Sequence, residues 1–359
     1  MQPATHADTA VILCIYCMTT HTDITTHLIE NATRNVYDIV TIALTHTAQH
    51  QALVIYDSEN ELTRIITQAY RNVLPNATFI DFHTCTHEEI IAMFDALNPR
   101  DLVVLIQSTD FRLNAFRIRI QLFQRKLKVI DHLHLYRNTP DSWETYINAL
   151  AYDTTWYRGV GQRLKEALRH THTLRVIGTG TELVVTGGLE IPKLNIGDYT
   201  DMENIGGTFP IGEVFTEAKD LHAMNGSLMV YAFADTDFNV AMHEPFRIDI
   251  NNGMVAGWST NAPEAFKNVI TQVQTNERAL IREIGFGLNR AITREHYLKD
   301  ITAFERILGM HFSLGEKHTV YKKQGITADK TRYHVDLFPI VTNVYADDVT
   351  LFENGVYIV

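Results

Sequence analysis

The amino-acid sequence predicts two domains of different fold class, an α/β domain followed by an α+β domain. The chain has 359 residues, and a domain built on a single hydrophobic core is usually shorter than this. Apolar strand-like runs alternate with helical stretches up to about residue 172, and short alternating strands with Gly, Asn and Asp turns follow. We therefore expect a Rossmann-like domain over residues 1–172. Residues 173–359 are expected to form a domain with a mixed, largely antiparallel sheet.

The first domain owes its predicted class to four apolar runs. These expected strands read AVILCIYC, QALVIYD, DLVVLIQ and LKVIDHLHL. Between the second and third runs, the stretch ENELTRIITQAYRNVL carries apolar residues at helical spacing. Strands that alternate with helices are typical of a parallel sheet with crossover connections.

The second domain is predicted from shorter segments with alternating polarity. The expected strands lie in TLRVIGTGTELVVTGG, MVYAFADTDF, FRIDINNGMVAGW, RYHVDLF and ENGVYIV. Asn252-Gly253 and Asn354-Gly355 are strong hairpin signals, and Gly178-Thr-Gly180 reads as a tight turn between strands. One helix is expected from about Ala262 to Glu283.

Composition narrows the classes of partner. The chain has 42 acidic and 31 basic residues and a formal charge of -11, which argues against nucleic acid or an anionic membrane as the main partner. The N-terminal stretch MQPATHADTA lacks the features of a signal peptide, and no apolar run approaches the ~20 residues of a membrane span. With only three cysteines, the chain fits a reducing compartment, so we expect a cytoplasmic protein.

Several histidine and cysteine spacings resemble metal or redox motifs but are assigned no function. His46 and His50 have the spacing of a helical zinc pair, yet Thr47 replaces the glutamate of that motif, so a solvated helix face is expected. Cys14 and Cys17 lie in an expected strand, where residues three apart face opposite sides, so core cysteines are expected. The remaining spacings are weak signals: His83, Cys85 and His87; His132 and His134; His170 and His172.

Four segments of the second domain place acidic residues or histidines among apolar residues and glycines. They read GGTFPIGEVF, REIGFGLN, FERILGMHFSLG and TRYHVDLF. Burial of a lone carboxylate costs several kcal/mol, so each one should be paired, protonated or bound to a cation. Two divalent cations would balance such a set, and separate ion pairs and caps would explain it equally well. The candidate ligands are Glu213, Glu283, Glu305, His311, His334 and Asp336.

The order of these segments resembles the metal-dependent aminopeptidases of the aminopeptidase T and S family. The shared pattern is G-E-V-F, then E-x-G-x-G-x-N, then E followed by L-G-x-H-x-x-L-G, then H-x-D. More loosely, YDSENEL and STDFRLNAFRIRI resemble the family's Rossmann-like half. The resemblance implies that the six candidates bind two divalent ions (zinc, cobalt or manganese), that a peptide is cleaved beside its free N-terminus, and that the protein is a homodimer. Glu283 would carry the proton.

The chain departs from the family's pattern near these ligands. Met310 stands where the family has threonine, and one residue fewer separates the preceding glycine from the histidine. Some members have a catalytic tyrosine seven residues after the central histidine, where this chain has His318. Tyr321 is the nearest tyrosine and becomes the second catalytic candidate beside Glu283. These changes keep the ligands but alter the surrounding pocket.

Two other functions remain open. The fold also resembles that of iron-dependent 2,5-dihydroxypyridine dioxygenases, and His311, His334 and Asp336 alone would make a two-histidine, one-carboxylate site for one iron(II). The substrate would then be a small molecule instead of a peptide. A non-catalytic metal-binding relative is the third possibility. Retention of all three glutamates favours the aminopeptidase, because a mononuclear site has no use for three further acids.

Overall fold

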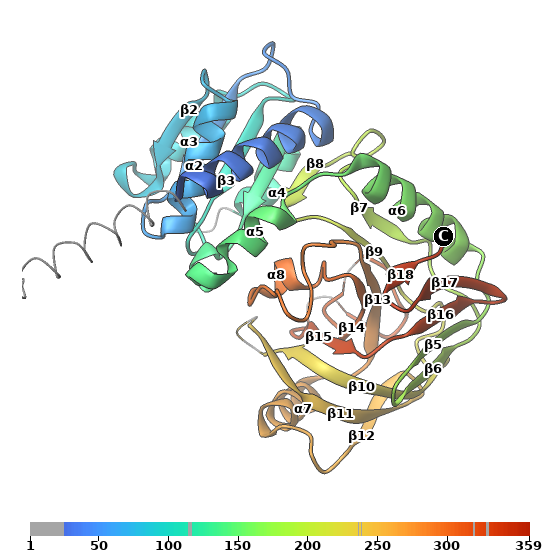
Figure 1. Ribbon diagram of the computed structural model, residues 1–359. Helices are drawn as coiled ribbons and strands as arrows, with labels where there is room; N and C mark the ends of the chain where they lie inside the picture. The colour runs from blue at the N-terminus through green and yellow to red at the C-terminus, as the bar shows by residue number, and fades with distance from the viewer. Residues whose placement is uncertain (1–24, 114–116, 236, 238, 319, 328–329) are drawn as a thin grey trace, which may run out of the picture. The chain divides into compact units, whose positions relative to one another are not determined.

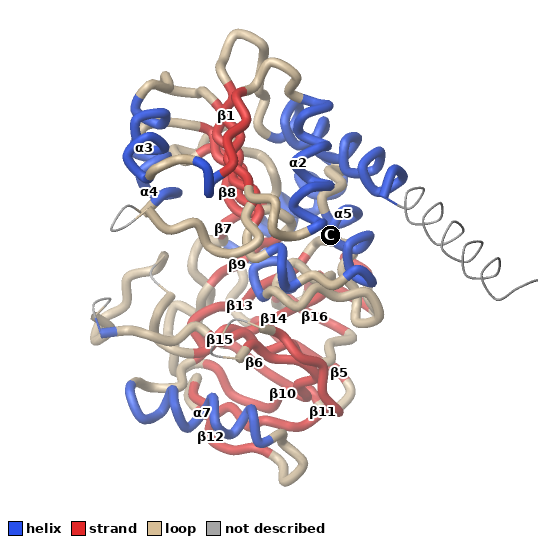
Figure 2. Tube along the Cα trace, turned by 90° about the vertical axis from the view of Figure 1, so that its left-hand side faces the viewer, coloured by secondary structure: helices blue, strands red, loops and turns tan. Residues whose placement is uncertain are grey.

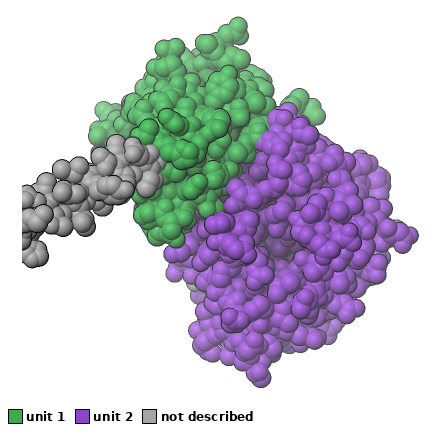
Figure 3. Space-filling model, viewed as in Figure 1, with its two compact units in different colours: residues 1–152, 199–209 green, residues 153–198, 210–359 purple. Residues whose placement is uncertain are grey.

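The computed structural model describes the chain except residues 1–24, 114–116, 236, 238, 319 and 328–329. It divides into two compact units (Figure 3): unit 1 is Met1–Tyr152 with Tyr199–Phe209, and unit 2 is Asp153–Asp198 with Pro210–Val359. A domain boundary at residue 172 stays a prediction. Cys14 and Cys17 lie outside the described residues, as does the first expected strand.

Unit 1 is built on a five-stranded parallel sheet in the order β2-β1-β3-β4-β8. Three of the four expected strands and the expected helix are confirmed. The strands are β1 Ala52–Tyr56, β2 Thr78–Asp81, β3 Leu102–Ile106, β4 Lys128–His132 and β8 Ile205–Thr208. The helices are residues 25–38 continuing into η1 Ile39–Ala43, then α2 Glu61–Val73, α3 His87–Asp95, α4 Ile118–Gln124 and α5 Trp143–Ala149, with short 3-10 turns η2 Phe82–Thr84, η3 Leu135–Arg137 and η4 Pro140–Ser142.

Local sequence explains how these elements begin and why they stay in place. The side chain of Asn60 accepts a hydrogen bond from the Leu62 backbone N–H and caps α2. Thr86 and Glu89 form a reciprocal capping box at the start of α3. The central strand β3 is buried along its whole length, as expected for a parallel sheet covered on both faces.

Unit 2 is dominated by a curled sheet of 13 strands whose described pairings are antiparallel (Figures 1 and 2). The main path runs β18-β17-β16-β5-β6-β10-β15-β14-β13-β9-β7, and β11 joins β10 to β12. The strands are β5 Leu174–Gly178, β6 Thr181–Val185, β7 Lys193–Asn195, β9 Glu213–Thr216, β10 Met224–Ala234, β11 Val240–Asn251, β12 Met254–Trp258, β13 Ile281–Gly287, β14 Gly309–Leu314, β15 Val335–Pro339, β16 Asn343–Ala346, β17 Val349–Glu353 and β18 Val356–Tyr357. The helices are α6 Thr154–Arg169, α7 Glu264–Asn276 and α8 Ile301–Phe304.

The predicted hairpin turns are confirmed. Asn252 and Gly253 join β11 to β12 with φ angles of 49° and 73°, and Asn354 and Gly355 join β17 to β18 with 47° and 86°. Two successive positive φ angles are what a two-residue hairpin of this hand requires, and Asn-Gly adopts them at low cost. The tight turn between β5 and β6 is also confirmed.

The helix predicted from Ala262 to Glu283 is wrong over residues 277–283. Helix α7 ends at Asn276, and Glu283 lies in β13. Phe266 packs on Phe246 of β11 and Trp258 of β12, at ring-centroid distances of 4.8 and 6.0 Å, so the first half is held to the sheet. Figure 2 shows α7 beside these strands. Beyond Asn276 the helical spacing of side chains ends, and in β13 the side chains alternate as in a strand.

No helix among the described residues is long and apolar enough to cross a bilayer.

Candidate metal centre

Strands β13, β14 and β15 of unit 2 place three polar residues in one row. Glu283 lies opposite Ser313, and Ser313 lies opposite Asp336. A β-bulge makes this row possible, because Ile281 and Glu283 pair with consecutive residues of β14 and Arg282 is left over as the extra residue. Such a bulge re-aims the side chains that follow it.

Gly285 makes room for His311 in the next row. The two residues are opposite each other, and a Cβ added to Gly285 would lie 2.1 Å from the His311 Cε1 atom. Glu283, Gly285 and Gly287 share one face of the strand, because side chains alternate along it. Gly287 in turn pairs with Glu213 of β9. The E-x-G-x-G pattern is therefore an acid followed by Gly285, which leaves space for the His311 ring, and Gly287, which leaves space for the backbone of Arg306 and Ile307.

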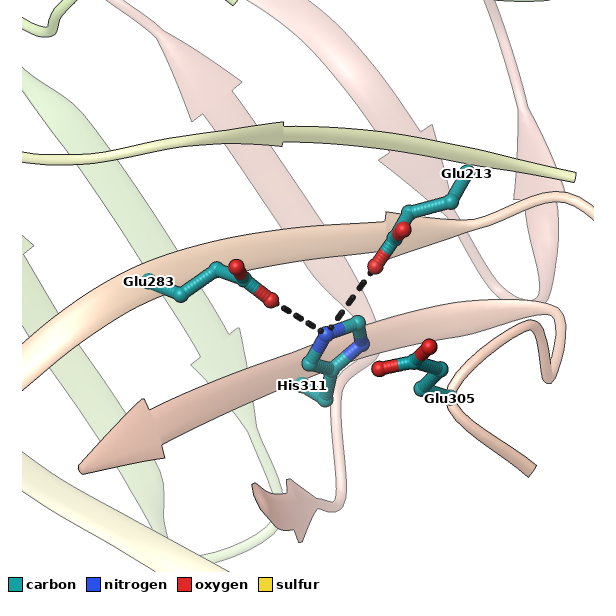
Figure 4. Close-up of side chains that lie close together, drawn as sticks. All are labelled: Glu213, Glu283, Glu305 and His311. Atoms are coloured by element: carbon teal, nitrogen blue, oxygen red, sulfur yellow. Dashed lines mark hydrogen bonds and ion pairs between the residues drawn. The ribbon is translucent and has the colours of Figure 1, made fainter. Parts of the chain in front are cut away.

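The six sequence-predicted ligands lie together as two overlapping groups. Within each group the potential ligand atoms all lie within 4.8 Å of one another. Glu283 and Glu305 belong to both groups. The first group adds Glu213 and His311, shown with the two shared acids in Figure 4, and the second adds His334 and Asp336.

Distances inside the cluster are those of direct polar contact. The His311 Nε2 atom lies 3.3 Å from Glu213 Oε1 and 3.2 Å from Glu283 Oε1, as the dashed lines in Figure 4 mark. His334 Nε2 lies 3.3 Å from Asp336 Oδ1. Glu213, Glu283, His311 and Asp336 are all at most 6% exposed, so bulk water does little to screen their charges.

One guanidinium group accompanies the four acids. Arg306 pairs with Glu213 through Nη1 and lies 2.8 Å from Glu305 Oε1 through Nη2. Four carboxylates against one fixed positive charge leave an excess of negative charge inside the protein. Sequence reasoning did not identify Arg306, although it directly follows Glu305.

The pKa shifts show how protein groups respond to this excess. Burial lowers the pKa of His311, but Glu213 and Glu283 outweigh burial and raise it well above the usual value. Burial also opposes charging of His334, yet Asp336 raises its pKa to about 9. Burial raises the pKa of Glu305 to about 8. Protons held on these three groups offset the negative charge that the site gathers.

The set of ligand atoms suits divalent cations, and two buried potential ligand atoms without a good hydrogen bond support this interpretation. Glu213 Oε1 and His311 Nδ1 are buried and lack a hydrogen bond of good geometry among the residues that the structure describes, although Oε1 lies within ion-pair distance of His311 Nε2. A single imidazole N–H at Nε2 cannot serve the oxygens of Glu213 and Glu283 at once. Imidazole nitrogens and carboxylate oxygens are common ligands of zinc, cobalt and manganese. The residues present therefore fit a metal site.

Two further residues, which the sequence did not indicate as ligands, contact the cluster. The Ser313 hydroxyl donates to Asp336 and lies 3.3 Å from Glu283 Oε1. His318 Nε2 lies 2.9 Å from Glu283 Oε2. Ser313 is two residues after His311 on a strand, so the alternation of side chains was the available signal. For His318 only its position seven residues after His311 stood out.

Tyr321 lies beside His318, with ring centroids 5.8 Å apart. Its hydroxyl donates to the Ile191 carbonyl at 2.6 Å, and burial raises its pKa above the usual value. That hydroxyl therefore has a backbone partner in this structure. A catalytic role for Tyr321 stays a prediction.

The other histidine spacings do not assemble into metal groups among the described residues. His46 and His50 lie in the loop after η1, so the predicted helix face was wrong: the helix ends before them. His83, Cys85 and His87 do not share a strand face, because β2 ends at Asp81 and the chain continues into a 3-10 turn and α3. Because the helix and the strand end before these residues, their side chains do not follow the helical or strand spacing on which the motifs depend.

Comparisons with known proteins show the fold. No family model matches the chain, and a search of curated proteins gave no match. The structure is similar to that of 2,5-dihydroxypyridine dioxygenase from Pseudomonas putida KT2440, with a TM-score of 0.62, 14% identity, and coverage of 91% of this chain and 96% of that one. It is also similar to wild-type AmpT from Thermus thermophilus, with a TM-score of 0.58, 13% identity, and coverage of 92% and 99%. Two different enzymes thus share this fold, and identity this low shows the fold alone.

Proposed function

We propose that this protein is a metal-dependent aminopeptidase with a dinuclear centre. The observation that carries the proposal is the membership of Glu283 and Glu305 in both donor groups. Two acids common to two cation positions are what a bridged pair of ions needs, and separate ion pairs would not require that overlap. The likeness to AmpT supports peptide hydrolysis as the chemistry of such a centre.

In this proposal, different residues would hold the two cations, and Glu283 would also transfer the proton. Glu213 and His311 would hold one cation, His334 and Asp336 the other, and Glu283 with Glu305 would face both. Bound divalent ions lower the pKa of water toward neutrality and polarise a carbonyl oxygen. Without bound cations, hydrogen bonds from His311 and His318 outweigh burial and keep the pKa of Glu283 well below its usual value. With cations bound, the Glu283 carboxylate would accept the proton of the attacking water and pass it to the leaving amine.

A mononuclear dioxygenase is the second candidate function. The likeness to the dihydroxypyridine dioxygenase favours it, and His311, His334 and Asp336 offer a two-histidine, one-carboxylate set. Against it, His311 belongs to one donor group while His334 and Asp336 belong to the other. That separation supports two cation positions over one.

Metal content and substrate turnover distinguish the two. Protein purified without added metal would be analysed for metals and then incubated with free and N-acetylated peptides. We expect two equivalents of zinc, cobalt or manganese per chain and release of the first residue from free peptides only. One iron per chain, with oxygen uptake on a dihydroxypyridine, would replace the proposal with the dioxygenase. Homodimer formation is part of the proposal and would be measured by light scattering.

A further inference from the structure

The two carboxylate oxygens of Glu283 are held by different neighbours. Oε1 lies 3.2 Å from His311 Nε2 and 3.3 Å from Ser313 Oγ. Oε2 lies 2.9 Å from His318 Nε2. Contacts at both oxygens therefore restrict rotation of the carboxylate, and His318 provides the contact at Oε2.

Packing fixes the His318 ring. His318 is 8% exposed, and its ring meets Phe215 edge-on with centroids 5.8 Å apart. The Tyr321 ring lies 5.8 Å away and the His334 ring 6.1 Å away. A ring enclosed by three others has few alternative rotamers, so the contact with Glu283 is prearranged.

The backbone at His318 is also fixed, by the residue that forms the β-bulge. Arg282 Nη2 donates to the His318 carbonyl at 3.0 Å, and Nη1 donates to the Glu316 carbonyl at 3.2 Å. Arg282 is itself buried and paired with Glu217. The bulge thus sends Arg282 to the loop after β14 and Glu283 to the ligand cluster, and both residues meet the same loop.

His318 belongs to neither donor group, although it touches an acid that belongs to both. We propose that His318 is a positioning residue, which holds Glu283 Oε2 so that this carboxylate can face both cations. The inference rests on the proposed function, in which Glu283 is the shared acid. Its effect is expected first on metal binding and then on turnover, because misorientation of a shared ligand weakens both cation positions.

The test compares H318F, H318Q and a loop control, K323M. Phenylalanine keeps the ring packing and removes the polar contact, whereas the glutamine amide can still donate to Glu283. Lys323 contacts Glu190 and the Ala218 and Lys219 carbonyls, so K323M removes another anchor of the same loop without touching Glu283. Metal affinity would be measured by calorimetry with Mn²⁺ and Zn²⁺, and coordination by the visible spectrum of Co²⁺-loaded protein.

We expect H318F to lose about 10- to 100-fold in metal affinity, the usual effect of removing a group that orients a ligand, and to show an altered Co²⁺ spectrum. Its kcat falls with KM little changed, H318Q recovers most of both losses, and K323M resembles wild type. Wild-type affinity and spectrum in H318F would overturn the proposal, as would an equal loss in K323M or no recovery in H318Q. A wild-type protein that binds metal but cleaves no peptide would defeat the proposed function alone, since the metal readouts still decide the role of His318. A wild-type protein that binds no metal would overturn both.

Discussion

Both units bury ionisable side chains, but they treat them differently. In unit 1, His132 is fully buried between two tyrosines, with Nε2 2.9 Å from the Tyr70 hydroxyl and Nδ1 2.9 Å from the Tyr146 hydroxyl. Asp101 accepts backbone N–H groups of Gln51 and Asn98 at 2.8 and 2.7 Å. In unit 2, the buried acids and imidazoles face one another, with Arg306 as the guanidinium paired to Glu213 and Glu305.

The comparison shows that burial of a histidine or an acid does not by itself make a site. A buried polar group whose partners come from the protein is complete and contributes to the fold. A buried group of like charges that the protein's own positive charges do not balance needs an external cation or bound protons. Unit 2 therefore needs bound cations or protons at its acid cluster, whereas the buried groups of unit 1 have protein partners.

The largest effect is expected from G285A. The added methyl group would overlap the His311 ring, with atoms 2.1 to 2.7 Å away, and would push that ligand out of place. We expect metal affinity and peptidase activity to fall by about 100-fold or more. G257A in β12 is the matched control, because its Cβ would approach only Asp249 Oδ2, at 3.8 Å. Calorimetry on both variants decides, and normal metal binding by G285A would refute this account of the glycine.

Metal removal is expected to weaken unit 2 selectively. A ligand at about 1,000 times its Kd stabilises the folded state by roughly 4 kcal/mol, so chelation should expose β13, β14 and β15 to faster amide hydrogen exchange. Strands β1 and β3 of unit 1 should keep their rates. Hydrogen exchange followed by mass spectrometry, with and without chelator, measures both units in one sample. Equal acceleration in the two units would remove the distinction drawn between them.

Acid should weaken unit 1 through His132. Burial lowers the pKa of His132 to about 3, below the roughly 6.5 of an unfolded histidine. The unfolded state therefore binds the proton first, and stability falls as pH decreases from about 6.5 toward 3. In H132F this pH dependence should be shallower, although stability at pH 7 falls because Tyr70 and Tyr146 lose a partner. Exchange rates in β4 between pH 4 and 7 provide the measurement; an unchanged slope in H132F would contradict the assignment.

The smallest effect is expected from H83A in unit 1. His83 is about half exposed and lies 3.3 Å from Glu59, a surface pair of the kind worth at most about 1 kcal/mol. Metal stoichiometry should not change, and the free energy of unfolding should shift by less than about 1 kcal/mol in a denaturant titration. Loss of a metal ion would mean that a discarded spacing in unit 1 binds metal after all.

The sequence predicted features that depend on local period and turn chemistry. Alternation along RYHVDLF put His334 and Asp336 on one face, and in the structure their side chains lie 3.3 Å apart. The predicted helix from Ala262 to Glu283 is too long, because α7 ends at Asn276 and Glu283 lies in β13.

Features that depend on pairing between distant segments could not be read from spacing. The contact of His318 with Glu283 follows from the bulge at Arg282 and from the path of the loop after β14. Arg306 reaches Glu213, which lies 93 residues away in sequence. Neither contact has a local signature in the sequence.

The central claim, two cation positions that share acids, is tested most directly by counting tightly bound divalent ions per chain after dialysis. We predict two for wild type, one for E213Q, and none for E283Q, because Glu213 belongs to one donor group and Glu283 to both. Circular dichroism would confirm that each variant is folded. Two ions retained in E283Q, or a single ion in wild type that E213Q leaves unchanged, would contradict the claim.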